Sequence, residues 1–425
     1  MGFQQGLSGL SAASTNLDVI GNNIANVNTA GFKQSKAQFN DILSNSINGA
    51  GVSQVGIGAK VSTIAQSFNQ GNISMTNNPL DIAIDGQGFF RMSDNGAVSY
   101  SRNGQFQLDA QGFMTNAEGL NLTGYMADVE GNIDSSKTVN LKLNTADLPP
   151  KVTSQYDWGF NLDSTESIPT VGTFDATNLD SFNFTKSGTI YDSLGNSHQL
   201  AIYFQKTATA NTWNTYATIV GKVDDTTGAP VGITLNGNPS SSLTFDGAGI
   251  LTGIDGAAAA PINVSVNLTA IDATLGAISP LVFDLNLTET TQFGSASSVK
   301  SNFQDGYAAS RLAGFSTSPE GIIQGNYSNG ESRPIAQVAL ANFINPQGLA
   351  AVGNGQWIET PSSGQPLVGA PKTGTLGVLQ ASAVEDANVD LTTELVKMIT
   401  AQRMYQANAK SIETQDAVLQ TLVNL

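Results

Sequence analysis

The chain has 425 residues, a length typical of two to four domains, and its 34 acidic against 18 basic residues give a net charge near −16. A nucleic-acid binder needs a basic face, so this balance disfavours that class of protein. The sequence contains no cysteine, which excludes disulfide frameworks, zinc–thiolate sites and thiol catalysis.

The N-terminal stretch MGFQQGLSGLSAAST has no lysine or arginine and no continuous apolar core, so we expect no cleaved signal peptide. No stretch of the sequence approaches 18 uninterrupted apolar residues, so we expect no insertion into a membrane. These features predict a protein that is either cytoplasmic or exported without a cleaved signal.

Helical periodicity is strong at the N-terminus. The apolar residues step by three and four, the spacing of a coiled-coil seam, at Leu10, Ala13, Leu17, Ile20, Ile24 and Val27. The helix then enters the amide-rich stretch NNIANVNTAGFK, from Asn22 to Lys33. Neutral amides suit a face that packs against other chains, where buried charge would be costly. We therefore expect Asn22, Asn23 and Asn26 to form hydrogen bonds between neighbouring chains.

The same stretch contains the predicted end of the helix. We expect Asn28, Thr29 and Gly31 to end it, with Gly31 at a positive φ, and Phe32 to anchor the outgoing chain.

The middle of the chain is typical of β structure. It is rich in glycine, and Asn-Gly and Asp-Gly pairs separate short alternating runs such as INVSVNL and LVFDLNL. The run AVSYSRNGQFQLD predicts a β-hairpin that turns at Asn103-Gly104. The segment 149–289 predicts a β domain of its own, entered through the LPP at 148–150.

No motif in this region predicts chemistry. The single histidine, His198, has no nucleophile elbow beside it, and we expect it at the edge of a strand or in a turn. The acidic residues do not follow the spacing of a calcium loop and favour turns instead. We predict no catalytic residue, no cofactor and no metal site, and therefore no enzyme.

A second helix is predicted at the C-terminus. Its seam again steps by four and three, at Leu391, Leu395, Met398, Gln402, Tyr405, Ala409, Ile412, Asp416, Leu419 and Val423. Asp390 is the expected N-cap, and Glu394 suits the positive end of the helix dipole. A remote β body cannot cover two terminal seams. The helices must pair with each other, pair with other chains or stay disordered.

Four segments resemble the axial proteins of the bacterial flagellum, the family of rod and hook proteins. They are ANVNTAGFK (25–33), VGIGAKV (55–61), GNISMTNNPLDIAIDGQGFF (71–90) and ELVKMITAQRMYQANAKSIETQDAVLQTLVNL (394–425). Rod members of this family are much shorter, and the large extra β segment resembles the hook members. The resemblance implies a structural subunit of the hook, a flexible hollow tube that acts as a universal joint and transmits torque from rod to filament.

The resemblance also implies an α+β multidomain fold, with a coiled-coil inner layer of both terminal helices and nested, mainly antiparallel β domains. The implied segments are 1–33 with 386–425 in the inner layer, 34–70 with 360–385 as connection, 71–148 with 290–359 as first β domain, and 149–289 as the outer β domain.

The implied partners are other copies of the chain, the distal rod protein, the hook cap and hook–filament junction proteins, and the flagellar export apparatus. The implied location is the extracellular flagellum. Together with the two seams, the resemblance predicts a polymerisation interface of Leu10, Leu17, Ile20, Asn22, Asn23, Ile24, Asn26, Val27, Thr29, Gly31, Phe32, Leu395, Met398, Gln402, Arg403, Tyr405, Asn408, Ile412, Leu419 and Leu422.

Two alternatives stay open. The first is a distal rod protein of the same family, with a stiff rather than bendable assembly. The second is a β-rich surface adhesin or carbohydrate-active enzyme, against which the paired terminal seams and the missing signal peptide argue.

Overall fold

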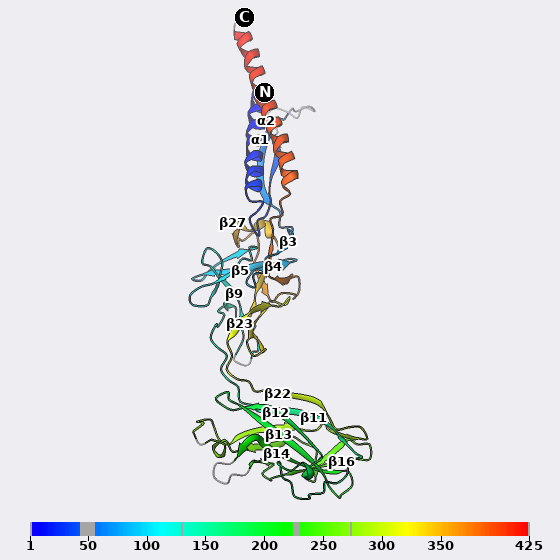
Figure 1. Cartoon of the computed structure of the whole chain (residues 1–425). Helices are drawn as coiled ribbons and strands as arrows, with labels where there is room; N and C mark the ends of the chain where they lie inside the picture. Colours follow the sequence, from blue (N-terminus) through cyan, green and yellow to red (C-terminus); the bar gives the residue numbers. More distant parts are fainter. Residues whose placement is uncertain (1, 43–55, 129–130, 224–229, 273, 424–425) are drawn as a thin grey trace. The chain divides into compact units, whose positions relative to one another are not determined.

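The computed structural model describes residues 2–42, 56–128, 131–223, 230–272 and 274–423 of the chain. The polypeptide divides into two compact units. The terminal unit contains Met1–Thr145, Ala313–Asn326 and Gly330–Leu425, and the inserted unit contains Ala146–Leu312 and Tyr327–Asn329. As predicted, the described chain is mostly β with a helix towards each terminus (Figure 1).

Two long helices belong to the terminal unit. Helix α1 (Gly2–Ala25) and helix α2 (Leu391–Val423) contact each other, and Figure 1 shows them side by side in blue and orange-red. Strands β1 (Ser35–Ile42) and β2 (Gly58–Gln66) form an antiparallel pair that also contacts α1. Helix α1 is therefore covered on two sides within its own chain.

The rest of the terminal unit is β structure. Two small antiparallel ladders join segments near its two chain ends, β3 (Ile73–Met75) with β31 (Ala383–Glu385) and β4 (Ile82–Asp85) with β30 (Val378–Ala381). Thirteen of the described strands form one larger sheet: β5 (Phe89–Asp94), β6 (Ala97–Ser101), β7 (Gln107–Leu108), β8 (Met114–Thr115), β9 (Asn121–Met126), β10 (Val139–Asn140), β23 (Leu312–Thr317), β24 (Ile322–Tyr327), β25 (Ser332–Val338), β26 (Leu340–Asn342), β27 (Ala350–Gly353), β28 (Gln356–Ile358) and β29 (Leu367–Gly369). A short 3₁₀ helix, η3 (Pro346–Gly348), precedes β27.

The larger sheet owes its stability to apolar residues from both halves of the unit. Phe90, Met92 and Leu122 come from the N-terminal half, and Ile323 and Val338 come from the C-terminal half; all five are buried in one cluster. Burial of such side chains contributes roughly 1.5–3 kcal/mol each. The core therefore forms only when segments more than 200 residues apart in the sequence pair.

The inserted unit has a single sheet and a single large core among its described residues. Its twelve strands are β11 (Gln155–Asp163), β12 (Phe184–Tyr191), β13 (Ser197–Lys206), β14 (Thr212–Val223), β15 (Pro230–Leu235), β16 (Ser241–Phe245), β17 (Leu251–Ile254), β18 (Ala257–Ala258), β19 (Ile262–Val266), β20 (Leu281–Asn286), β21 (Thr291–Phe293) and β22 (Ser298–Gln304). Two 3₁₀ helices, η1 (Leu179–Ser181) and η2 (Leu268–Ala270), lie in its connections.

The alternation noticed in the sequence sets the two faces of this sheet. In β20, Leu281, Phe283 and Leu285 are buried while the residues between them are exposed or partly exposed. Strand β19 buries its apolar residues in the same way and pairs with β20 antiparallel. Both alternating runs, INVSVNL and LVFDLNL, are therefore strands, as predicted.

The inserted unit extends further along the chain than the segment 149–289 assigned to it from the sequence. Strand β22 pairs antiparallel with β11, and β21 pairs parallel with β11. The unit consequently includes residues 290–312, which are predicted to lie in the first β domain.

The hairpin predicted at Asn103-Gly104 is wrong. Strand β6 pairs with β5 and β28, and the turn into it is made at Asn95-Gly96, whose φ angles are 46° and 101°. At Gly104 the absent side chain serves a close approach, because a Cβ there would lie 1.7 Å from the Ile82 carbonyl oxygen. Both Asn-Gly pairs look alike in the sequence, yet only the first has the positive φ values of a hairpin turn.

A different turn recurs through both units. An Asp or Asn accepts the N–H group four residues later with its side-chain oxygen, at 2.7–2.9 Å, and a glycine at positive φ stands between them. The accepting residues are Asp109, Asn116, Asp192 and Asp246. These side chains compete with the backbone for local hydrogen bonds. Part of the acidic composition thus serves turn formation.

Candidate assembly interface

Helix α2 begins at the predicted N-cap. The N–H and hydroxyl groups of Thr393 donate to the Asp390 carboxylate at 3.1 and 3.0 Å, and these bonds hold the pKa of Asp390 below its ordinary value. Glu394 follows in the first turn and is buried. Its carboxylate accepts from Gln34 at 2.8 Å and Lys397 at 2.7 Å, so the buried charge is satisfied.

The two helices run antiparallel. Near the C-terminal half of α2, a Cβ on Gly6 would lie 2.9 Å from the Ile412 side chain, and a Cβ on Gly9 would lie 2.8 Å from the Asn408 side chain. At the other end of the pair, Asn23 donates to the Glu394 carboxylate at 3.1 Å. Small residues on α1 therefore let the backbones approach closely, and polar groups join the opposite ends.

The β1–β2 pair covers another side of α1. Gln5 donates to the Gly56 carbonyl at 2.6 Å, and the Ala59 N–H donates to the Ser8 hydroxyl at 3.3 Å. Asn23 donates to the Ser35 carbonyl at 2.8 Å and accepts from the Ser35 N–H at 2.9 Å. The side-chain amide of Asn23 is buried, and both its nitrogen and its oxygen form hydrogen bonds within its own chain. We had expected these bonds to form between chains.

The other amides of NNIANVNTAGFK are more accessible. Asn26 donates to the Asn22 carbonyl at 3.0 Å and accepts from the Thr29 hydroxyl at 3.2 Å. The three residues line a cavity of about 420 Å³, together with Phe32 and residues of the β27–β28 hairpin. Unlike Asn23, they keep polar groups near solvent.

The positive φ predicted for Gly31 is confirmed, but helix α1 ends earlier than predicted, at Ala25, so Val27, Asn28 and Thr29 lie beyond it. Gly31 has φ 72°, and its N–H donates to the Glu385 carbonyl at 2.7 Å. A Cβ at this position would lie 2.5 Å from the Arg102 carbonyl carbon, so the turn is also a close approach of two backbones.

The predicted interface residues fall into three classes of exposure. The buried ones are Ile20, Asn23 and Gly31. The partly buried ones are Leu10, Leu17, Ile24, Asn26, Val27, Phe32, Met398, Asn408 and Ile412. The exposed ones are Asn22, Thr29, Leu395, Gln402, Arg403, Tyr405 and Leu419. Leu422 lies in the last turn of α2, and its side chain is outside the described residues.

The face that α2 turns towards α1 agrees with the predicted seam only in part, because Met398, Ala409 and Ile412 of that seam are partly buried and Ile412 lies against Gly6. Glu394, Ala401 and Asn408, at heptad spacing, are also buried or partly buried, whereas Leu395 and Gln402 of the predicted seam are exposed. Apolar side chains are consequently left in solvent, among them Leu395 at 45%, Val396 at 59% and Ile399 at 52% exposure.

Some exposed apolar residues lie outside the predicted seams, those of α2 because they break the three–four stepping and those of α1 because they precede Leu10, where the predicted seam begins. They are Val396, Ile399, Met404 and Val418 on α2, and Phe3 and Leu7 on α1. The available signal was the number of apolar residues, which exceeds what one seam can bury. Such an exposed apolar surface is typical of a protein–protein contact.

Helix α2 also extends past α1. Gly6 lies opposite Ile412, and the pair is antiparallel, so the start of α1 at Gly2 lies about one helical turn beyond Ile412 along α2. The last described residues of α2 therefore extend past the start of α1 (Figure 1). Val418 and Leu419 lie in this overhang, each about half exposed.

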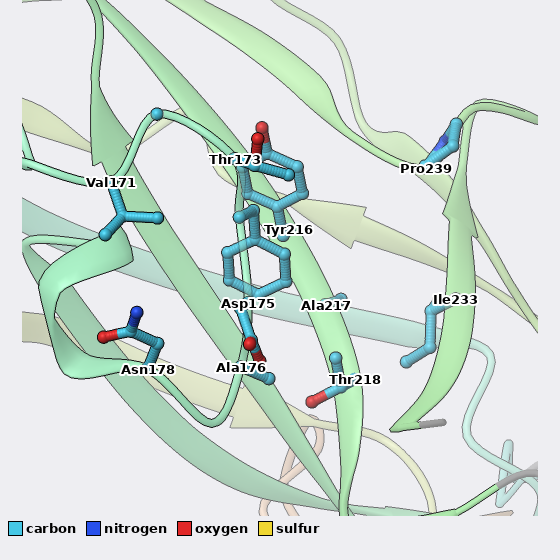
Figure 2. Close-up of a pocket in the computed structure, with 12 residues that line it drawn as sticks. Val171, Thr173, Asp175, Ala176, Asn178, Tyr216, Ala217, Thr218, Ile233 and Pro239 are labelled. Atoms are coloured by element: carbon cyan, nitrogen blue, oxygen red, sulfur yellow. The ribbon is translucent and has the colours of Figure 1, made fainter. Parts of the chain in front are cut away.

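The inserted unit contains a pocket of about 830 Å³ (Figure 2). The rings of Phe174 and Tyr216 stack there with centroids 4.1 Å apart. Its one acidic residue, Asp175, accepts from the N–H and hydroxyl of Thr177 in a local turn, so its oxygens are already used. The pocket therefore offers shape and apolar surface, without an acid–base pair for catalysis.

The remaining chemical candidates are structural. His198 lies in β13, as expected for a strand near a turn, with Nε2 3.1 Å from an Asp192 carboxylate oxygen. Across the described ranges, no three His, Asp or Glu side chains gather as a metal site would require. Neither helix of the described chain is long and apolar enough to cross a membrane.

Comparison with protein families gives four matches along the chain. They are "Flagella basal body rod protein" over residues 3–33, "Flagellar hook protein FlgE/F/G D1 domain" over 83–154, "Flagellar basal body protein FlaE D2 domain" over 161–307 and "Flagellar basal body rod FlgEFG protein C-terminal" over 380–425.

Individual relatives match over the whole length. The flagellar hook protein FlgE of Escherichia coli (strain K12) is 41% identical over 429 residues, with 100% of both chains covered. That of Salmonella typhimurium (strain LT2) is 39% identical with 100% of both covered, and that of Borreliella burgdorferi (strain B31) is 33% identical with 99% of this chain and 98% of its own covered. A crystal structure of Helicobacter pylori flagellar hook protein FlgE2 has a TM-score of 0.52 and 14% identity, covering 74% of this chain and 99% of that one, a likeness in fold alone.

Proposed function

This chain belongs to the flagellar hook protein family, and from that membership we propose that it is a structural subunit that polymerises with copies of itself into the flagellar hook. The observation that carries this proposal is the apolar surface that α2 leaves uncovered within its own chain. In water such a surface is unfavourable, and copies of the same chain can cover it in a repeating assembly.

In the assembled hook, α1 and α2 form the inner layer, packed as a coiled coil around a central channel. The connecting segments, the first β domain and the inserted β domain follow outward in that order. Close packing of long helices supports this role, because hydrogen-bonded helices resist stretching and carry torque along the tube.

The outer β domains slide past one another as the tube bends, so the hook acts as a universal joint. Low charge and many small polar residues support this part, since the contacts they make are weak and reform easily. The family implies a rod protein at one end, cap and junction proteins at the other, and export of the subunit through the flagellar secretion apparatus.

Electron microscopy of the purified full-length chain tests the proposal. We expect hollow tubes that curve, and a chain reduced to residues 34–389 should remain dispersed while keeping its β-sheet circular dichroism. Tubes formed by the shortened chain would refute assembly through the helices. Straight, inflexible tubes would favour the distal rod alternative over the hook.

A further inference from the structure

Three charged side chains from distant parts of the sequence meet in the interior of the terminal unit. Lys33, Arg102 and Glu385 are 1%, 4% and 1% exposed. The Glu385 carboxylate binds both cations, with one oxygen 2.6 Å from Lys33 Nζ and the other 3.1 Å from Arg102 Nη1. A fully buried ion cluster of this kind is uncommon, since removing charges from water is costly.

The three residues mark the place where both terminal segments join the β structure. Lys33 follows α1, Arg102 directly follows β6 of the larger sheet, and Glu385 ends β31 shortly before α2. Each pairing therefore links a different part of the unit. The N-terminal segment, the C-terminal segment and the sheet share one carboxylate.

Backbone groups add to the cluster, although the buried Arg102 Nε has no hydrogen-bond partner among the described residues. Lys33 donates to the Asn69 carbonyl at 2.9 Å, and Arg102 donates to the Gly86 carbonyl at 2.7 Å. The Gly71 N–H donates to the Glu385 carboxylate at 2.8 Å. The Arg102 guanidinium also lies over the Phe89 ring, 5.5 Å from its centroid. The side chains are thus held in one arrangement.

The charges in this cluster do not balance. Two cations share one anion, and burial lowers the pKa of Lys33, with Glu385 opposing and Arg102 reinforcing that shift. Loss of Lys33 would leave one neutral pair, Glu385 with Arg102. Loss of Glu385 would leave two like charges buried side by side. The carboxylate is therefore the member on which the whole arrangement depends.

We propose that Glu385 is the positioning residue of a joint that docks the N-terminal and C-terminal segments on the β sheet together, so that neither segment stays docked without the other. The consequence for the hook rests on the proposed function: the inner helices would be held on the β domain only after the C-terminal segment has arrived. The joint itself is a property of the free subunit.

Hydrogen exchange measured by mass spectrometry on the free full-length subunit tests this joint. Two peptides are compared, 26–36, which contains the Gly31 N–H bound to the Glu385 carbonyl, and 383–390, which contains the Asp386 N–H bound to the Asn72 carbonyl. In Glu385→Gln we expect exchange in both peptides to accelerate on the order of 100-fold. In Lys33→Met we expect both to accelerate together, by less than about 10-fold, because a neutral pair remains.

Glu320→Gln is the matched control, because it breaks a Lys372–Glu320 pair of similar length, 2.7 Å, whose side chains are 60% and 42% exposed. Its exchange in both peptides should equal that of the unaltered chain. Two results would overturn the proposed joint. One is faster hydrogen exchange in only one of the two peptides of Glu385→Gln, and the other is an equal effect of Glu385→Gln and Lys33→Met.

If Glu385→Gln does not fold, Glu385→Asp serves instead, since it keeps the charge and withdraws it by one methylene. Acceleration of both peptides would support the joint, and acceleration of one alone would contradict it. Because the subunit is free in all these measurements, a negative result leaves the proposed assembly standing. Loss of tubes with normal exchange would instead count against the assembly alone.

Discussion

The exposed apolar side chains of α2 allow a quantitative prediction. The triple substitution Leu395→Ala, Val396→Ala and Ile399→Ala removes about eight apolar carbon atoms, worth about 0.8 kcal/mol each on full burial. These side chains are about half exposed in the subunit, so about half of that free energy, roughly 3 kcal/mol, is still available to assembly. A factor of ten in concentration corresponds to about 1.4 kcal/mol. The concentration of free subunit in equilibrium with tubes should therefore rise about 100-fold.

Sedimentation of tubes from a dilution series measures that concentration. The free subunit should keep its circular dichroism, because the higher helix propensity of alanine offsets part of the contacts that these half-buried side chains make within the subunit. Ile344→Ala is the control, because this side chain is 83% exposed and lies outside both helices. If the triple variant and the unaltered chain leave the same amount of subunit in the supernatant, α2 does not contribute this surface to the assembly.

Three further predictions concern pH, the turn after α1, and the helices themselves. Burial raises the pKa of Asp305, but bonds from Ser154, from the Gln155 N–H and from Lys151 outweigh it and lower the pKa from 3.8 to about 2. The ionised Asp305 carboxylate therefore stabilises the folded protein fully above pH 4, and this stabilisation is lost as the pH falls to 2. Acid unfolding should show the free energy of unfolding falling by about 1–2 kcal/mol over this range, and Asp305→Asn should lack this decrease. Gly31→Ala should destabilise the terminal unit by more than about 2 kcal/mol, measured by urea unfolding, because the cost of a positive φ adds to that of a clash with the backbone. Gly21→Ala is the control. It has open space at its Cβ and should be neutral or stabilising by up to about 1 kcal/mol. Free subunits should have less helix by circular dichroism than assembled tubes, since the end of α2 that extends past α1 gains neighbours only in tubes; equal helicity would contradict that dependence.

Local patterns in the sequence predicted elements well and pairings poorly. The strands at INVSVNL and LVFDLNL follow from alternation alone, because one face of each is buried in the nearest core. Strand β5 also pairs with β26, which lies about 250 residues later in the chain. No local sequence pattern predicts a pairing over that distance. At Asn103-Gly104 the turn signal was misleading. Gly104 is required because its backbone lies close to the Ile82 carbonyl, and the sequence does not distinguish such a glycine from one that is required for a positive φ.

The candidate interface shows a similar division. Heptad spacing correctly indicated that α2 has a face for another helix, but it selected the apolar column that begins with Leu395. In place of that column, the structure turns the neighbouring one, beginning with Glu394, towards α1 beside Ile412. Gly6 and Gly9 of α1 let Ile412 and Asn408 approach closely, and Asn23 donates to Glu394. The pairing of Glu385 with Lys33 was equally invisible, since an ion pair between residues 352 positions apart has no signature in either segment.

This exchange of columns is informative about assembly. In an ordinary helix pair the apolar residues face inward and supply most of the stability. Here Gly6, Gly9, Asn408 and Glu394 lie between α1 and α2 beside apolar residues such as Ile412, so that shape and hydrogen bonds specify much of the pairing within the subunit. The apolar side chains of α2, including Leu395, Val396 and Ile399, remain for other chains. A subunit built in this way keeps its helices in register through these contacts, and further apolar burial becomes available when neighbouring copies cover α2.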